Sequence, residues 1–387
     1  MKNSTKNNIG LLVAAAIIVG SIAYLQAHKP TPLAINAKDV VVEIPAPVTP
    51  LAKSVVEARK ASLPSKVGKY PKAKEFVAPS GFINTPPFKL SDVVGKKVVL
   101  IDFWTYSCIN CLRTTPYLNA WYSKYKDKGL VIIGVHTPEF DFEKDYNNVL
   151  SATKKIGVTY PVILDNDRST WTAYNNQYWP REYLIDIDGY IVHDHIGEGD
   201  YDKTERAIQE ALKERATVLG VPDTIPTTIS NPNDVITMNQ SQVGSPETYF
   251  GGGRNEYLGN GSKKTNGLQT LAATDAPQLN TLYLNGAWNF STEYAENKDT
   301  NGKIFYKFNS KNVYFVASSL NNVKVKIILD GRPIDKSMAG SDVDASGILN
   351  IKENRLYDIV HGADYGTHTL EMDIEGQGLD AYTFTFG

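Results

Sequence analysis

The sequence predicts an α/β domain followed by an all-β domain, and two observations lead to this prediction. Between residues 72 and 216, apolar strand-like runs alternate with helix-like segments, which is the pattern of an α/β domain with a largely parallel sheet. From about residue 243 onward, apolar and polar residues alternate over short segments, as they do in half-buried strands. A chain of 387 residues has room for two to three such domains.

The first 27 residues predict an export signal or a membrane anchor rather than a part of either domain. Lys2 and Lys6 precede an uncharged apolar run over residues 9–25. A basic stretch before such a run is typical of export signals. A run this short lies at the lower limit, roughly 17 residues, for a helix that crosses a bilayer. The sequence leaves open whether residues 1–27 are cleaved. Residues 28–72 are rich in proline and predict a semi-rigid spacer, with one short helix over 51–62.

The only two cysteines of the chain, Cys108 and Cys111, lie between a predicted strand and a predicted helix. Residues 98–101 (VVLI) read as a buried strand, and residues 112–125 suggest a helix with an apolar stripe. Cys108 therefore falls at a helix N-terminus, where free backbone N–H groups and the helix dipole favour a thiolate. A thiolate and a second thiol within one helical turn have the geometry of thiol–disulfide exchange.

Two structural roles for these cysteines are weaker interpretations. A disulfide between them would close so small a loop that it stabilises the fold little by chain entropy. A structural zinc site needs four ligands, and no second pair stands at a matching spacing. His193 and His195 alternate on one predicted strand, but no third ligand is evident nearby, so we predict no metal site. His136 either lines the cysteine site or is a structural residue.

The remaining elements of the α/β domain follow in order. We predict further strands over residues 130–135, 160–164, 183–186 and 190–195, and helices over residues 142–157, 169–178 and 202–215. Gly157 would end the first of these helices at its C-cap. Asp188 and Gly189 predict a hairpin turn between the last two strands. We place this domain at residues 73–217, a linker at 218–242 and the second domain at 243–387.

Five motifs of the first domain together resemble the thioredoxin-like domain of the DipZ proteins, a branch of the TlpA-like thiol–disulfide oxidoreductases. They are WTYSCINC (104–111), GVHTPEF (134–140), YPVILDND (160–167), WPREYLID (179–186) and HIGEGDY (195–201). The resemblance implies a thioredoxin fold, protein-disulfide oxidoreductase activity and no cofactor. It also implies a redox-active disulfide between Cys108 and Cys111, with Cys108 as the nucleophile and Cys111 as the resolving thiol.

The same resemblance assigns roles to four further residues. Asp102 falls where thioredoxins keep a buried acid, whose raised pKa would let it take the proton from Cys111. Pro180 matches the cis-proline that faces the cysteines and presents backbone to an extended substrate. Trp104 and Trp179 would line that substrate groove, or else belong to the core.

Two departures from the family pattern affect these roles. Thr114 stands where many TlpA-like reductases carry a glutamate, so that proton handling rests more on Asp102. The dipeptide between the cysteines contains no histidine, unlike that of strong oxidants of the DsbA type. Cys108 would then be only moderately acidified, which favours a reductase or an isomerase over an oxidant.

The second domain reads as an antiparallel sandwich, with a jelly roll as the expected arrangement. Residues 323–327, 370–374 and 382–386 alternate most clearly. The domain resembles the C-terminal domain of the DipZ proteins, which is likened to carbohydrate-binding modules. Aromatic side chains that would stack on a glycan, or else pack in the core, are Tyr249, Phe250, Tyr257 and Trp288. Docking or orienting the first domain is an equally good role.

These features predict an exported, membrane-tethered thiol–disulfide oxidoreductase on the extracytoplasmic face of the membrane, leaning toward reduction of envelope proteins. DipZ proteins also carry a CcdA-type membrane domain, which we do not find here, so a reductase would need a separate membrane electron donor. A formal charge of −2 argues against nucleic acid as a partner. Alternatives are a thiol peroxidase, whose resolving cysteine is usually remote, and a glycan-binding envelope protein with an inert disulfide. The direction of electron flow, the substrates and the oligomeric state stay open.

Overall fold

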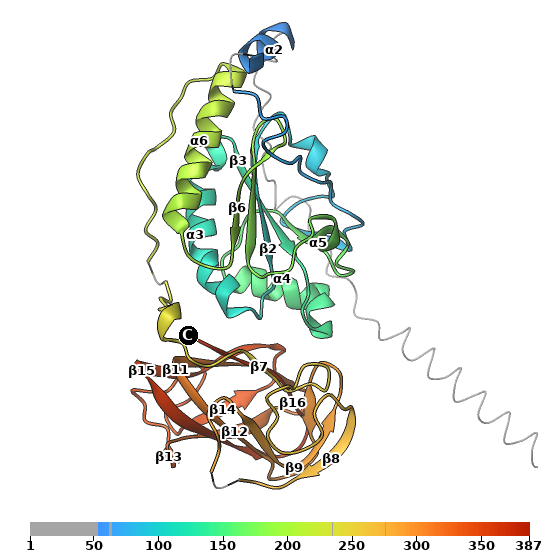
Figure 1. The fold of residues 1–387 in the computed structure, drawn as a ribbon, viewed down its shortest axis with the longest axis vertical. Helices are drawn as coiled ribbons and strands as arrows, with labels where there is room; N and C mark the ends of the chain where they lie inside the picture. Colours follow the sequence, from blue (N-terminus) through green and yellow to red (C-terminus); the bar gives the residue numbers. More distant parts are fainter. Residues whose placement is uncertain (1–52, 62–63, 234, 275) are drawn as a thin grey trace, which may run out of the picture. The chain divides into compact units, whose positions relative to one another are not determined.

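The structure, a computed structural model, describes residues 53–61, 64–233, 235–274 and 276–387. The predicted signal or anchor at residues 1–27 and much of the predicted spacer lie outside these residues. Within the described ranges, no helix has both the length and the apolar character needed to cross a membrane. The chain forms an α/β domain and an all-β domain (Figure 1).

The first domain is built on a six-stranded sheet in the order β1-β4-β3-β2-β5-β6. Its strands are β1 (Gly81–Ile83), β2 (Val98–Trp104), β3 (Leu130–His136), β4 (Val162–Leu164), β5 (Arg181–Ile185) and β6 (Ile191–Ile196). Only β2–β3 and β3–β4 pair in parallel, whereas β1–β4, β2–β5 and β5–β6 pair antiparallel. The prediction of a largely parallel sheet was therefore wrong. The short turn at Asp188–Gly189 joins β5 to β6 directly, and a connection this short permits only antiparallel pairing.

The α-helices are α2 (Lys53–Ala61), α3 (Ile109–Tyr125), α4 (Tyr146–Lys155), α5 (Ser169–Ala173) and α6 (Tyr201–Leu219). Short 3-10 helices are η1 (Leu90–Asp92), η2 (Lys126–Lys128), η3 (Asp141–Lys144) and, after this domain, η4 (Gln240–Gln242). Helix α6 runs past its predicted end at residue 215 because the first left-handed residue, Gly220 (φ +64°), comes only after Leu219. Helix α4 begins later than predicted, since η3 and the N-cap Asp145 come first.

The sheet separates two apolar layers. Along β2, Leu100 and Trp104 point into the layer that contains Trp121 of α3 and Leu212 of α6. Ile101 and Phe103, which alternate with them, point into the opposite layer, which contains Trp171 of α5. Figure 1 shows α3 and α6 on one side of the sheet and α5 on the other. Because side chains alternate along a strand, Asp102 must project into the same layer as Leu100 and Trp104, toward α3.

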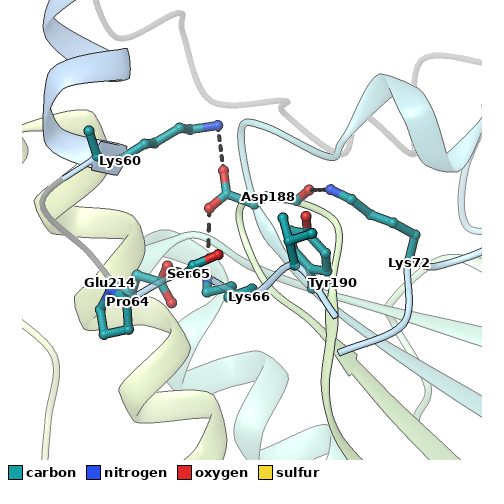
Figure 2. Close-up of a pocket in the computed structure, with 10 residues that line it drawn as sticks. Lys60, Pro64, Ser65, Lys66, Lys72, Asp188, Tyr190 and Glu214 are labelled. Atoms are coloured by element: carbon teal, nitrogen blue, oxygen red, sulfur yellow. Dashed lines mark hydrogen bonds and ion pairs between the residues drawn. The ribbon is translucent and has the colours of Figure 1, made fainter. Parts of the chain in front are cut away.

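Charged residues attach the segment after α2 to the edge of this domain (Figure 2). The Lys66 ammonium binds the carboxylates of Asp186 and Glu214, and Lys60 forms an ion pair with Asp188. The Lys72 ammonium donates to the backbone carbonyl of Asp188, 2.6 Å away. These residues line an open pocket of about 480 Å³ in which every charged side chain but Lys72 has a side-chain partner of opposite charge. The contacts therefore indicate a structural attachment.

The second domain consists of antiparallel strands, as predicted. They are β7 (Thr248–Tyr249), β8 (Gly267–Leu271), β9 (Leu282–Phe290), β10 (Ala295–Asn297), β11 (Lys303–Ser319), β12 (Val323–Leu329), β13 (Arg332–Pro333), β14 (Ile348–Ile351), β15 (Arg355–Glu375) and β16 (Leu379–Phe386). Strands β11 and β15 pair along most of their length and carry register shifts near Ser310 and Val313. Such irregularities bend a strand, which lets one long pair contribute to both sides of a core. The jelly-roll arrangement stays a prediction.

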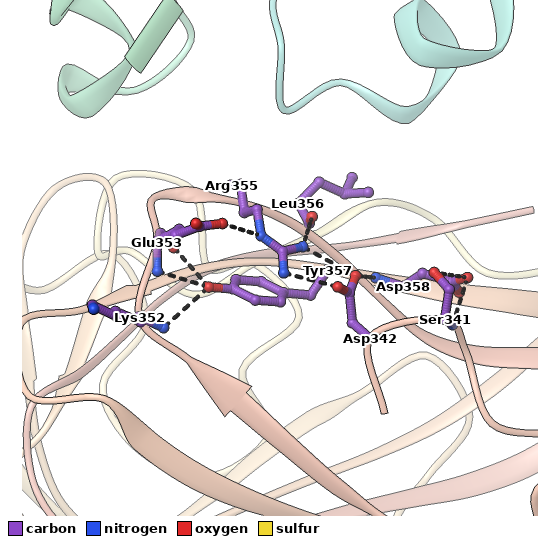
Figure 3. Close-up of polar contacts among 8 residues, drawn as sticks. All are labelled: Ser341, Asp342, Lys352, Glu353, Arg355, Leu356, Tyr357 and Asp358. Atoms are coloured by element: carbon purple, nitrogen blue, oxygen red, sulfur yellow. Dashed lines mark hydrogen bonds and ion pairs between the residues drawn. The ribbon is translucent and has the colours of Figure 1, made fainter. Parts of the chain in front are cut away.

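A network of polar contacts holds the start of β15 (Figure 3). The Arg355 guanidinium donates to both carboxylate oxygens of Asp342, at 3.0 and 2.8 Å, and lies over the ring of Tyr357. The Tyr357 hydroxyl in turn accepts from the backbone N–H groups of Lys352 and Glu353. Paired, bidentate contacts of this kind fix the strand geometrically. The network therefore reads as structural.

Candidate active site

The two cysteines lie at the junction of β2 and α3. Cys108 is the N-cap residue of α3, and its Sγ accepts a hydrogen bond from the backbone N–H of Cys111 at 3.4 Å. Both are present as free cysteines: Cys108 is half-buried, whereas Cys111 is only 2% exposed. One sulfur can therefore meet a partner from outside while the other lies behind it. The helix N-terminus directs a backbone donor at the outer sulfur, where negative charge would form.

Burial separates the chemistry of the inner thiol from that of the outer one. Desolvation raises the pKa of Cys111 well above its usual range, and the hydrogen bond with Cys108 and the negative charge of Asp102 act in the same direction. A thiol with such a pKa needs a base before its sulfur can attack. The inner cysteine is thus protected from solvent but depends on a neighbouring proton acceptor.

Asp102 lies within β2, in the layer beneath α3, and is buried as the resemblance implies. It is 2% exposed, and desolvation raises the pKa of its carboxyl to about 8. Its Oδ1 has no hydrogen-bond partner among the described residues. Near neutral pH a carboxyl with this pKa is partly ionised, and its ionised form can accept a proton from a nearby thiol.

The peptide bond between Trp179 and Pro180 is cis, as the resemblance implies. Pro180 immediately precedes β5, whose first residue Arg181 pairs with Phe103 of β2. The cis-proline therefore lies beside the end of β2 from which the cysteine turn begins. The Trp179 indole is half-buried and donates to the carbonyl of Thr137 at 3.1 Å. It stays a candidate for the rim of a substrate groove.

Trp104 does not fit the groove role, and that prediction needs correction. Its side chain is 2% exposed and packs in the apolar layer beneath α3, edge-on to the imidazole of His136. The alternation along β2 gives Trp104 the same inward direction as Asp102, which explains its burial. His136 is also fully buried, and burial lowers the pKa of its imidazole to about 3, so that it stays neutral.

A buried carboxylate that the sequence analysis missed supports the turn before Cys108. Glu143, in η3, is fully buried and accepts a hydrogen bond of 2.6 Å from the Ser107 hydroxyl. Its other oxygen accepts from the backbone N–H groups of Glu139 and Phe140, at 2.6 and 3.0 Å. Glu143 thus ties the loop after β3 to the residue next to the nucleophile. No local pattern of the sequence could have found this contact, because the partners are 36 residues apart.

Thr114, which replaces the family glutamate, makes a local contact instead. Its hydroxyl donates to the carbonyl of Asn110 at 2.9 Å and lies 3.3 Å from the Tyr201 hydroxyl. A hydroxyl bonded in this way is no proton acceptor for Cys111. The described part of the chain also holds no group of three or more His, Cys, Asp and Glu side chains arranged for a metal ion.

In the second domain, two of the four proposed glycan-stacking residues are core residues. Phe250 and Trp288 have no exposed surface and belong to the main apolar cluster of that domain. Neither side chain reaches the surface, so stacking on a glycan is excluded for both. Tyr249 is half-buried, and Tyr257 is 39% exposed. Tyr257 is the best placed of the four for an external ligand.

Each of the two domains matches a known family model. Residues 72–212 match the family model described as Redoxin, and residues 245–387 match that described as "Thioredoxin like C-terminal domain". Protein DipZ of Mycobacterium tuberculosis is 35% identical over 311 residues, which are 80% of this chain and 42% of that protein. The chain thus spans less than half the length of the DipZ proteins it matches.

Shorter relatives match the first domain alone. The thiol-disulfide oxidoreductase ResA of Bacillus thuringiensis is 32% identical over 131 residues, which are 32% of this chain and 73% of that protein. The solution structure of a thioredoxin-like protein in the oxidised form is 26% identical and covers 38% of this chain and 97% of that one, with a TM-score of 0.35. The sequence identity to ResA and DipZ, together with the Redoxin match, identifies the first domain as thioredoxin-like. The chain belongs to the thioredoxin-like thiol–disulfide oxidoreductases, the family that includes ResA and the DipZ proteins.

Proposed function

We propose that this chain reduces disulfides of cell-envelope proteins through Cys108 and Cys111. The observation that supports this most is the pairing of a half-buried Cys108 at a helix N-cap with a buried Cys111 above a buried acid, Asp102. That arrangement gives the two sulfurs different accessibility, as stepwise exchange requires. The inert-disulfide alternative would leave the buried carboxyl without a role.

The proposed reaction proceeds in two exchanges. The Cys108 thiolate attacks one sulfur of the substrate disulfide, so that a mixed disulfide forms and the other substrate sulfur leaves as a thiolate. Cys111 then passes its proton to Asp102 and attacks Cys108 Sγ, and the remaining substrate sulfur leaves. The substrate gains two electrons, and the protein loses two as the Cys108–Cys111 disulfide forms.

Turnover in this direction requires an external reductant. We propose a separate membrane protein of the CcdA type as the electron donor. The basic and apolar pattern of residues 1–27 supports export and tethering at the extracytoplasmic face of the membrane. The second domain contains no cysteine, which supports a role in binding or orientation rather than in exchange. A glycan is one candidate ligand, with Tyr257 as the contact to test first.

The reduction potential of the cysteine pair tests the proposed direction. The full-length protein in detergent would be equilibrated with glutathione redox buffers, and the reduced fraction measured by thiol trapping. We expect a value near or below about −220 mV, as in thioredoxins and glutaredoxins. A value near about −120 mV, as in DsbA, would show a disulfide donor and overturn the reductase assignment. Consumption of peroxide at a rate above that of disulfide exchange would favour the peroxidase alternative.

A further inference from the structure

A row of three titratable side chains crosses the sheet behind the cysteines. Asp102 of β2 is the register partner of Glu182 of β5, and Glu182 is the register partner of His195 of β6. Directly paired residues on antiparallel strands point to the same face of a sheet. All three side chains therefore share one face, and β6 is the edge strand where the row ends.

The row is buried at its inner end and lacks the usual hydrogen bonds. Glu182 is 1% exposed, and neither of its carboxyl oxygens has a partner within hydrogen-bond geometry among the described residues. Asp102 Oδ1 and His195 Nε2 are likewise buried without a partner. Buried polar atoms in folded proteins nearly always have a hydrogen-bond partner. Unpaired atoms on three neighbouring strands of the sheet, β2, β5 and β6, therefore require an explanation. A scaffold role alone would be served better by apolar residues.

On the buried side, the described groups near Asp102 and Glu182 are hydroxyls and a thiol. Tyr160 and Cys111 lie near Asp102, and Tyr201 and Thr204 of α6 approach Glu182. Burial and the charge of Asp102 raise the pKa of Glu182 to about 8, while the Thr204 hydroxyl acts in the opposite direction. Two adjacent buried carboxyls resist double ionisation, because two negative charges would then lie side by side in the core. The pair therefore loses its second proton only at a higher pH than its first.

At its outer end, on the edge strand β6, the row lies near a second histidine, His193, and an acid, Asp200. His193 lies on the same face of β6 as His195, and its Nε2 lies 3.1 Å from the Thr204 hydroxyl. Asp200, which precedes α6, lies close enough to both imidazoles to interact with them electrostatically. Of the three residues in the row, only His195 is half-buried rather than buried, so it is the one that reaches solvent.

We propose that Glu182 is a positioning residue that shares a proton with Asp102, and that His195 carries this proton between the pair and solvent. The proposal rests on the proposed function and deepens it. As Cys111 Sγ bonds to Cys108 Sγ, the Cys111 proton passes to the carboxyl pair and the substrate sulfur leaves. The pair then returns one proton to the His195 imidazole, which releases it to water, so that no charge accumulates in the core.

The chain supplies a matched control next to the row. Asp194 lies one residue before His195, but it pairs with Tyr183 and so faces the other side of the sheet. It is exposed and bound to Arg181 at 2.7 Å. Asp194→Asn therefore removes a carboxylate from the same strand without touching the row.

Stopped-flow reaction of the reduced full-length protein with one equivalent of Ellman's reagent separates the two thiols. Attack by Cys108 releases the first coloured thiolate, and attack by Cys111 on the mixed disulfide releases the second. The leaving group departs as an anion, so the second phase depends on the Cys111 proton alone. Wild type, Glu182→Gln, His195→Gln and Asp194→Asn would be compared from about pH 5 to about pH 10.

We expect Glu182→Gln to move the midpoint of the second phase to lower pH by about one unit, since a neutral neighbour no longer repels charge on Asp102. His195→Gln should keep the midpoint and slow the second phase severalfold in dilute buffer. Asp194→Asn should match wild type. The first phase should be the same in all four proteins.

Coincident second-phase profiles of wild type and Glu182→Gln would overturn the shared proton, and an unchanged rate in His195→Gln would overturn the route through β6. If Glu182→Gln fails to fold, carboxyl carbon NMR of the wild type decides: two coupled titrations support the pair, and two independent ones refute it. Absence of both phases in the wild type would instead count against the proposed function.

Discussion

Asp102 and Glu182 face each other across the pairing of β2 and β5, and both carboxyl groups are buried in the layer that α3 and α6 cover. This relationship puts two acids behind Cys111 where the family pattern alone supplies one. Glu182 also takes the second position after the cis-proline, so the strand that follows this proline carries the second buried carboxyl.

Replacing the resolving cysteine should trap the reaction halfway. In Cys111→Ser, Cys108 can still attack a substrate, but no internal thiol can release it. We expect a stable mixed disulfide with a model substrate peptide, detected by mass spectrometry as an adduct on the protein. Cys108→Ser is the matched control and should form none, because the remaining thiol is buried. Equal adducts on both variants would contradict the assigned order of attack.

Asp102→Asn should make folding stability less dependent on pH. The carboxyl has a pKa of about 8 in the folded protein, raised from 3.8 by burial. The folded state therefore binds more protons than the unfolded state between these values, and wild-type stability falls as pH rises through that window. We expect Asp102→Asn to be more stable than wild type at high pH by on the order of 3 kcal/mol, with little difference near about pH 4.

Urea unfolding at several pH values measures this difference. Asp194→Asn, which removes an exposed carboxylate, serves as the control and should keep the wild-type pH dependence. A parallel pH dependence in Asp102→Asn and wild type would show that Asp102 ionises normally in the folded protein.

Glu143→Gln should weaken the turn that carries Cys108. The carboxyl accepts from the Ser107 hydroxyl and from two backbone N–H groups, whereas an amide offers only one oxygen and places its own N–H groups against donors. We expect a loss of about 1–3 kcal/mol in the free energy of unfolding. The first phase of the reaction with Ellman's reagent should slow as well. Glu210→Gln, on the exposed face of α6, should leave both quantities unchanged.

Two aromatic substitutions distinguish core from surface in the second domain. Trp288 is fully buried, and its indole donates to the carbonyl of Asn285 at 2.9 Å. Trp288→Ala should cost about 3–5 kcal/mol of stability by leaving a cavity. Tyr257→Ala should change stability by less than about 1 kcal/mol, because that side chain is largely at the surface. Thermal unfolding of both variants checks this order, and a reversed order would refute the assignment.

The sequence by itself determined the elements whose signals are local. The apolar run of β2, the cysteines at the start of α3 and the hairpin turn at Asp188–Gly189 were predicted correctly because each depends on neighbouring residues. The burial of Asp102 and the cis bond before Pro180 followed from the resemblance, which transfers known geometry to matching positions. The roles of these residues in exchange stay predictions.

Only the tertiary structure decided which side chains meet. The row from Asp102 through Glu182 to His195 depends on strand register between segments far apart in sequence, which no local pattern encodes. The same holds for Glu143 and Ser107, which join two loops. Burial of Trp104 and Trp288 was likewise decided by the strand face on which each lies, since an aromatic residue serves a core and a binding surface equally well by composition.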